Sequence, residues 1–271
     1  MKKSMVMLAL LSGVLASCSS APGTAAPAPA DGAGVTATRP TTLIMDDGSR
    51  QTVTGIVRDG MLLIEDDIIV SENVGALEGQ GTYVVDTRLR WTGNTIPYVF
   101  ASNVPQAIRD RVRAAASYVG SQTNVDVVPR TNQANYVEFT YNTGTSCASA
   151  LGKVGGRQTI TLADRCSTGS IVHELGHTMG LFHEQTRPDR DRYVSIQWQY
   201  IADDWKSQYQ IRSGSAGYGS YDYDSIMHYP AYSNGNLVIK PLDPSVDPAR
   251  MGQRSSYSTT DIRTINAMYP L

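Results

Sequence analysis

The sequence predicts an α+β fold with two lobes and a cleft between them, from three features. Residues 104–122 carry apolar side chains at helical spacing. The segments NYVEFTY (135–141) and QTITLA (158–163) alternate polar and apolar residues as strands do. Three of the four histidines fall in VHELGHTMGLFHEQ (172–185). A mixed sheet, a backing helix and this histidine-bearing helix would form the upper lobe, and the loop-rich chain after Gly180 the lower one.

The N-terminus predicts export. MKKSMVMLALLSGVLASC starts with two lysines, continues as an apolar run too short to span a bilayer, and ends in small residues. Its end, LASC, resembles a bacterial lipobox, so residues 1–17 are interpreted as a signal cut before a lipidated Cys18. The alternative is an ordinary signal with an incidental cysteine. The lipobox predicts a protein held at the outer membrane or cell surface by its lipid anchor only, with release possible after processing.

Three zones follow the signal. Residues 18–41, rich in Pro, Ala, Gly and Ser, have little to bury and are expected to form a disordered tether. Residues 42–81 alternate Ile, Val and Leu with Asp, Glu and Gly, which indicates short strands in a unit too small to be stable alone. Residues 82–271 are long enough for a full domain.

The histidine stretch has the spacing of a catalytic zinc site. His173 and His177, four residues apart on a helix, lie on one face. Gly180 can end that helix and let His183 return as a third ligand, which leaves a fourth position open for water. Glu174 is placed to take the proton of that water. A lone HExxH is often only a solvated polar face, but HExxHxxGxxH fixes five positions. The sequence therefore predicts one Zn²⁺ per chain.

The extended motif, followed by SIMHY at 225–229, resembles the astacin family of zinc endopeptidases, which are metzincins. Other segments resemble that family in kind and order: RWTGNTIPYVF (90–100), VVPRTNQANYVEF (127–139), GKVGGRQTITL (152–162) and TTDIRTINAMYP (259–270). The resemblance covers about residues 82–271, so it implies an astacin-like catalytic domain.

The resemblance also implies roles for single residues. Tyr229 would be a zinc ligand at rest and would contact the oxyanion during catalysis. Met227, in the Met-turn, would pack beneath the zinc. Glu184 would help to hold the mature N-terminus. His228 is interpreted as structural rather than as a fourth zinc ligand.

Residues 42–81 would then be a propeptide. The family's propeptides carry an F-x-G-D motif whose Asp ligates the zinc, and the nearest match is IEDDI (64–68). Asp67 falls on the inhibitory position, although Asp66 replaces the Gly and could substitute at the metal. The alternatives are an acidic hairpin loop without this role and steric blockage of the cleft. Maturation is expected by cleavage near Gly79 to Tyr83.

Cysteine usage fits an oxidising compartment. With Cys18 lipidated, Cys147 and Cys166 remain as a pair, and they match one of the two disulfides usual in astacins. A loop of about twenty residues gives a stabilisation of roughly 3 kcal/mol. The second family disulfide is absent, because Asn124 stands where its first Cys would be. The two ends of the domain are thus expected to be held by packing alone.

The sequence therefore predicts a zinc-dependent endopeptidase, made as a zymogen, that acts on proteins or peptides. The alternatives are an inactive zinc-holding lipoprotein that serves as a binding module and, more distantly, a zinc amidase of cell walls. Intact Glu174, histidines and Tyr229 favour the enzyme. A net charge of −2 gives no basic footprint for nucleic acid, and we expect a monomer.

Overall fold

The structure is a computed structural model that describes residues 34–44, 50–71, 82–84, 89–212, 215 and 217–271. The predicted signal, Cys18 and most of the tether lie outside these residues. The described helices are α1 (Gln106–Gln122), α2 (Thr168–Thr178) and α3 (Thr259–Met268). The described strands are β1 (Val35–Ile44), β2 (Arg50–Arg58), β3 (Met61–Ile64), β4 (Ile68–Ser71), β5 (Thr82–Val84), β6 (Thr95–Phe100), β7 (Asp126–Pro129), β8 (Tyr136–Tyr141), β9 (Ala148–Ser149), β10 (Arg157–Leu162), β11 (Val194–Ile196), β12 (Tyr232–Ser233), β13 (Asn236–Leu237) and β14 (Ile239–Pro241).

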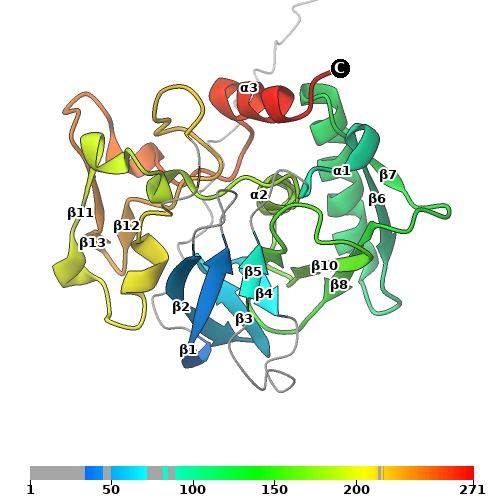
Figure 1. Cartoon of the computed structure of the whole chain (residues 1–271), viewed down its shortest axis with the longest axis horizontal. Helices are drawn as coiled ribbons and strands as arrows, with labels where there is room; N and C mark the ends of the chain where they lie inside the picture. The colour runs from blue at the N-terminus through cyan, green and yellow to red at the C-terminus, as the bar shows by residue number, and fades with distance from the viewer. Residues whose placement is uncertain (1–33, 45–49, 72–81, 85–88, 213–214, 216) are drawn as a thin grey trace, which may run out of the picture.

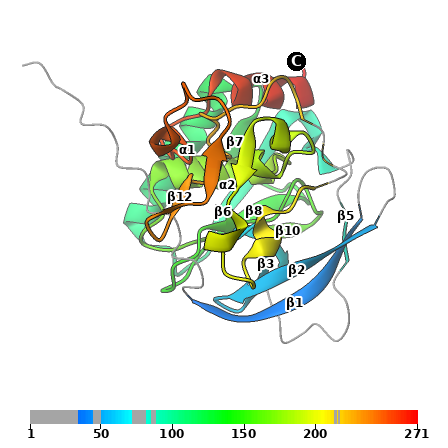
Figure 2. The same cartoon turned by 90° about the vertical axis from the view of Figure 1, so that its left-hand side faces the viewer.

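One mixed sheet joins strands β1 to β4 to the main domain. Among the described residues it has ten strands in the order β5-β1-β2-β3-β4-β9-β10-β8-β6-β7. The junction is narrow, because β4 pairs with β9 only through Ile68 and Ser149, in parallel. In both views β1 to β3 lie along the edge of the molecule opposite α3 (Figures 1 and 2).

The upper lobe (residues 89–180 with α3) has the expected backing helix and strands. The apolar residues at helical spacing in 104–122 are all buried, namely Val104, Ile108, Val112, Ala115 and Val119. Helix α1 packs with α2 in one core that also includes residues of β6, β8 and β10. Trp91 donates its indole Nε1–H to Thr178 O at 2.8 Å, which ties the start of the domain to the end of α2. The predicted mixed sheet, backing helix and histidine-bearing helix are therefore confirmed.

The described residues 50–71, in the zone where short strands were predicted, are β-rich, but the boundary with the predicted tether differs. The tether was expected to reach Thr41, whereas β1 begins at Val35 and pairs with β2 along its length. The assignment of residues 35–41 to the tether is therefore wrong. Most of their side chains are exposed, so the segment is held by ladder hydrogen bonds, which composition does not reveal. At the other end Tyr83, in β5, pairs with Leu43.

The lower lobe (residues 181–258) is mostly loops and 3₁₀ turns, as its composition indicated. Its described strands form two small pairs, β11 with β14 and β12 with β13. Within the described residues, no helix is long and apolar enough to cross a membrane.

Hydrogen bonds, rather than packing alone, hold the two ends of the domain together. Asn124, at the position of the missing cysteine, donates Nδ2–H to Tyr269 O at 3.1 Å and its backbone N–H to Asn266 Oδ1 at 2.8 Å. Asn94 donates to Pro270 O at 3.0 Å. The expectation of packing alone is therefore wrong, because Asn124 supplies polar links at the position where the resemblance implies a cysteine.

Candidate functional site

Helix α2 presents the first two histidines. Ser167 caps its N-terminus by accepting the backbone N–H of Ser170 at 3.0 Å. His173 and His177 point from one face, and the helix ends before Gly180, whose φ of +105° is disfavoured for other residues. The chain then turns back and brings in His183. All three imidazoles are almost fully buried.

The second nitrogen of each imidazole fixes its orientation. Nδ1–H donates to Ile226 O at 2.8 Å in His173, to Leu181 O at 2.7 Å in His177 and to Glu65 Oε2 at 2.9 Å in His183. Each Nε2 is therefore left with a lone pair, and this is the arrangement that holds metal-ligating histidines in the correct tautomer.

Asp67 completes a group of four ligand atoms that lie within 4.8 Å of one another. Its carboxylate oxygens lie 3.1 Å from His173 Nε2, 3.3 Å from His177 Nε2 and 3.3 Å from His183 Nε2. Ligands about 2.0–2.2 Å from a tetrahedral zinc lie about 3.3–3.5 Å apart. The donor set and its spacing thus fit zinc.

The neighbouring Asp66 has a different partner. Its φ of +70° places it in the left-handed region, which accounts for the Gly at this point of the family motif. Its carboxylate forms a buried ion pair with Arg58, whose guanidinium stacks over Trp205, and its backbone N–H donates to Gln208. The aspartate directed at the histidines is therefore Asp67.

Glu174 and Tyr229 line the same cavity of about 120 Å³ as Asp67 and His173. Burial, and then the charge of Asp67, raise the pKa of Glu174 well above its ordinary value. The ring of Tyr229 lies edge-on to His183 with 4.6 Å between centroids, and its hydroxyl has no hydrogen-bond partner among the described residues.

The Met-turn lies beneath the histidines. Met227 is buried, and its sulfur packs so closely on Gly176 that a Cβ there would come within 2.6 Å. Asp261 of α3 accepts Ser225 Oγ–H at 2.7 Å and Ile226 N–H at 2.9 Å, which fixes the turn. His228 lies between Tyr221 and Tyr229 O, and burial lowers its pKa to about 4, so it is neutral and structural.

Glu184 lies beside a second, larger cavity of about 430 Å³ that Leu89 and Arg90 also line. Its carboxylate accepts from Arg187 Nη1 at 3.1 Å and from Asp222 N–H at 2.8 Å. Burial still raises the pKa of Glu184 to about 7. A positively charged group entering this cavity would stabilise the ionised form.

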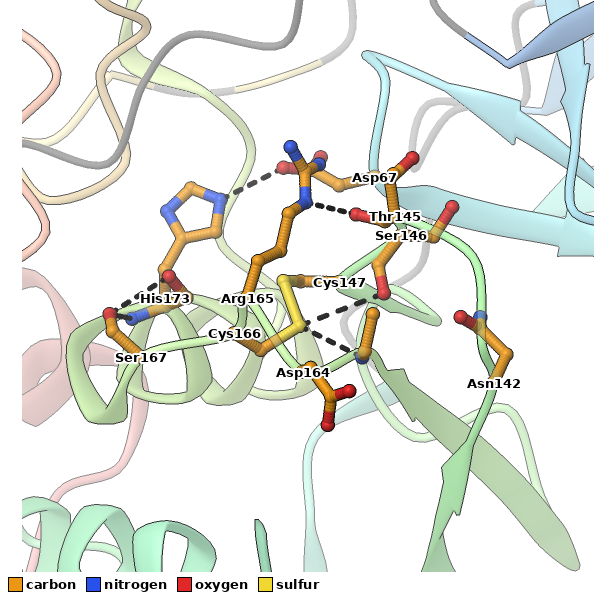
Figure 3. Close-up of a disulfide and its surroundings, with 12 residues drawn as sticks. Asp67, Asn142, Thr145, Ser146, Cys147, Asp164, Arg165, Cys166, Ser167 and His173 are labelled. Carbon is orange, nitrogen blue, oxygen red and sulfur yellow. Dashed lines mark hydrogen bonds and ion pairs between the residues drawn. A yellow bond between two sulfur atoms is a disulfide. The ribbon is translucent and has the colours of Figure 1, made fainter.

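The Cys147–Cys166 disulfide is present, as predicted. It lies beside the site, between the loop before β9 and the start of α2, with Arg165 reaching past it towards Asp67 (Figure 3). Arg165 donates to Thr145 O and lines the cavity that holds Glu174.

Sequence reasoning missed several charged residues of the site. Arg254 donates to Ile226 O at 2.8 Å and lines the Glu174 cavity. Glu65 and Arg212 form a buried ion pair at 2.5 Å across 147 residues. The three consecutive acidic residues at 65–67 indicated a charged site, but their neighbours in the sequence do not show which cationic residues they pair with.

The chain is similar to known zinc proteases. Residues 84–270 match the peptidase family described as Astacin. The chain is 35% identical over 229 residues to Nematocyst expressed protein 6 of Nematostella vectensis, with 78% of each protein covered. It is 37% identical to Zinc metalloproteinase nas-4 of Caenorhabditis elegans, over 66% of this chain and 59% of that one. Among solved structures, High choriolytic enzyme 1, a hatching enzyme zinc-protease from Oryzias latipes, is 34% identical with a TM-score of 0.60, covering 66% of this chain and 92% of that chain.

Proposed function

The chain belongs to the astacin family of zinc metalloendopeptidases, and on that premise we propose that it is an exported zymogen whose own Asp67 blocks the metal. The observation that carries the proposal is the position of the Asp67 carboxylate, 3.1–3.3 Å from the Nε2 atoms of all three histidines. A carboxylate oxygen there takes the position that catalytic water needs, and the covalent link between Asp67 and the catalytic domain makes its binding intramolecular.

Once Asp67 has left the metal position, each residue of the site would have its own role in peptide hydrolysis. His173, His177 and His183 would hold the zinc, which when bound acidifies a water molecule and polarises the peptide carbonyl. Glu174 would accept the water proton and pass it to the leaving amine, and its raised pKa suits that exchange. Tyr229, whose hydroxyl is unpartnered beside His183 in the described part of the chain, would donate to the oxyanion of the tetrahedral intermediate.

Maturation would also change the larger cavity beside Glu184. Cleavage near residues 79–83 would leave a new N-terminus a few residues before Leu89, which lines the larger cavity beside Glu184. An ammonium in that cavity would pair with the Glu184 carboxylate. The lipobox interpretation of Cys18 adds that the protein is anchored outside the cytoplasm by lipid.

The test of latency compares two single variants of the full chain. Asp67→Ala should give a precursor that cleaves peptides before processing or matures early, and a chelator should abolish that activity. Asp66→Ala is the matched control, because Asp66 is paired with Arg58 rather than with the histidines. If Asp67→Ala stays as latent as the wild type, blockage of the cleft by the propeptide strands is the better account. A zinc-loaded mature chain that cleaves no peptide at all would point instead to a binding module.

A further inference from the structure

The main chain is what links residues 34–71 covalently to the rest of the protein, because these residues contain no cysteine that could form a disulfide. We call their strands, β1 to β4, the β1–β4 unit. A cut near residues 79–83 would end the covalent link, and with it the high effective concentration that such a link gives. After the cut the unit would stay or leave according to its noncovalent contacts, which are of three kinds.

The first kind of contact is apolar. Three side chains of the unit are at most 4% exposed and belong to the apolar core around Trp205 and Tyr229, namely Ile56, Met61 and Leu63. If the unit left, these side chains and those that they cover in the lower lobe would return to water. Burial of apolar surface therefore favours the bound state even without a covalent link.

The second kind of contact is polar and reaches the lower lobe. Ser207 donates its Oγ–H to Thr54 O, in β2, at 2.7 Å. Glu65 and Arg212 form an ion pair at 2.5 Å, and both side chains are at most 1% exposed. Departure of the unit would leave the buried charge of Arg212 without its anion, which is costly because little water offsets the loss.

The third kind of contact reaches the upper lobe. At the turn between β2 and β3, Asp59 Oδ2 accepts from Ser146 Oγ–H at 2.6 Å and from the Ser146 backbone N–H at 3.2 Å. In β9, the backbone N–H of Ser149 donates to Asp67 O at 2.9 Å. The unit therefore contacts both lobes, and its retention would not depend on one contact alone.

The unit also shapes the turn that carries Asp67 by contacts of its own. Its strands pair in order, β1 with β2, β2 with β3 and β3 with β4. The ion pair of Arg58 with Asp66, directly before Asp67, lies wholly within the unit. None of these contacts involves residues 79–83. A cut there would leave them in place, and a preorganised turn loses less conformational freedom when it binds.

Strand β5 is a further link between the unit and the chain that follows. It pairs in parallel with β1, with Tyr83 opposite Leu43. A cut before Thr82 would therefore leave the new N-terminal segment paired with the unit. Transfer of that segment to the cavity beside Glu184 would require this pairing to break.

We propose that the β1–β4 unit stays bound after the chain is cut and acts as a noncovalent inhibitor, so that the first cut alone does not activate the enzyme. The partner that occupies the cleft is then a severed piece of the same chain. Activity follows the dissociation or further proteolysis of that piece. The inference rests on the proposed function, because it takes Asp67 as the inhibitory group.

The first experiment separates the cut from the release. A recognition sequence for a site-specific protease is inserted between Gly79 and Gln80 of the full chain, which is then cut to completion at micromolar concentration. Peptide hydrolysis should stay below about a tenth of its final rate, and should rise to that rate with a lag after about 1000-fold dilution, because release follows a slow dissociation. A cut chain that is fully active at once overturns the inference.

The second experiment needs no activity. In the Glu174→Gln variant, cut at the same place, the enzyme cannot degrade the severed piece. The pieces before and after the cut should co-elute in equal amounts in size-exclusion chromatography. Separate elution overturns the inference. Hydrolysis of peptides by the uncut wild type would contradict the proposed latency instead, and the elution would still decide whether the unit is retained.

Two neighbouring leucines of β3 provide a matched pair of variants. Leu63 lies in the core around Trp205, whereas Leu62 lies in a small cluster with Val57 that contains residues of the unit alone. Both leucines are at most 1% exposed. Leu63→Ala should make dissociation from the cut chain about 10- to 100-fold faster, and Leu62→Ala should have the smaller effect. Equal acceleration by the two changes would show that the contacts with the lower lobe do not retain the unit, and the inference would fail.

Discussion

The two main apolar cores of the molecule differ in which segments of the chain contribute side chains to them. The upper core, around Trp91, Phe139 and Val172, contains no described residue before Trp91. The second core, around Trp205, Tyr229 and Ile239, includes Ile56, Met61, Leu63 and Ile69 of strands β2 to β4. We call it the shared core.

Under the proposed maturation, the upper core would stay intact and the shared core would lose the side chains that β2 to β4 contribute. The upper core, to which α2 contributes, is formed without any of the described residues before Trp91. In the described structure the lower lobe packs against apolar side chains of β2 to β4, and β4 joins β9 through one residue pair, Ile68 with Ser149. If residues 34–81 are removed as proposed, apolar surface on the lower side of the cleft would be uncovered, and α2 would lose the contacts of Asp67 with His173 and His177 but keep its packing in the upper core.

The largest effect is expected for Glu174 of α2, and it tests whether the upper lobe supplies the general base. Glu174→Gln in the mature enzyme should lower kcat/KM by about 10²- to 10⁴-fold, because a general base is lost while the three ligands remain. Zinc content per chain should be unchanged. The matched control is Glu138→Gln, whose carboxylate only pairs with Arg157 at 2.6 Å on the sheet surface. Wild-type turnover by Glu174→Gln would remove this residue from the mechanism.

Two buried tryptophans give the next effect. Trp91→Ala, in the upper core, should cost about 3–5 kcal/mol of unfolding free energy in precursor and mature enzyme alike. Trp205→Ala should cost about as much in the precursor, where Arg58 of the propeptide stacks over its ring at 5.4 Å, and clearly less in the mature enzyme. Chemical denaturation of both forms checks this. Equal costs for Trp205→Ala in the two forms would contradict a shared core.

Tyr229 lies in the shared core, so its effect should depend on the form measured. Tyr229→Phe should leave the precursor as stable as the wild type or slightly more so, because it removes a buried hydroxyl that no described residue partners. In the mature enzyme it should lower kcat about 10²-fold and alter KM little, since the oxyanion contact exists mainly in the transition state. Unchanged kcat would make this tyrosine structural.

The smallest effect concerns the upper lobe alone. Asn124→Ala removes the 3.1 Å hydrogen bond to Tyr269 O and should cost about 1 kcal/mol. Because the propeptide does not touch this contact in the described structure, the loss should be equal in precursor and mature enzyme. Asn132→Ala, in an exposed turn, is the control and should be neutral. A larger cost in the precursor alone would show that the two cores are coupled.

Prediction from sequence succeeded where the signal was local. The helix at 106–122, the strands at 136–141 and 157–162, and the zinc motif follow from periodicity and spacing within short stretches. It failed at the start of β1, where residues 36–40 are exposed and the strand is held by ladder hydrogen bonds to β2. It left Asp66 and Asp67 undecided, because their sequence neighbourhood is almost the same and their partners lie elsewhere in the chain.

The sequence by itself determined the chemistry of the site. Histidines at i, i+4 and i+10 with a glycine between them converge on one metal because the α-helix has a fixed period and Gly180 can turn the chain back. Only the tertiary structure decided which carboxylates meet which cations. Asp67 faces the histidines, Asp66 pairs with Arg58, and Glu65 pairs with Arg212. Charge pairing depends on distance in space, and contacts across more than a hundred residues leave no periodic trace in the sequence.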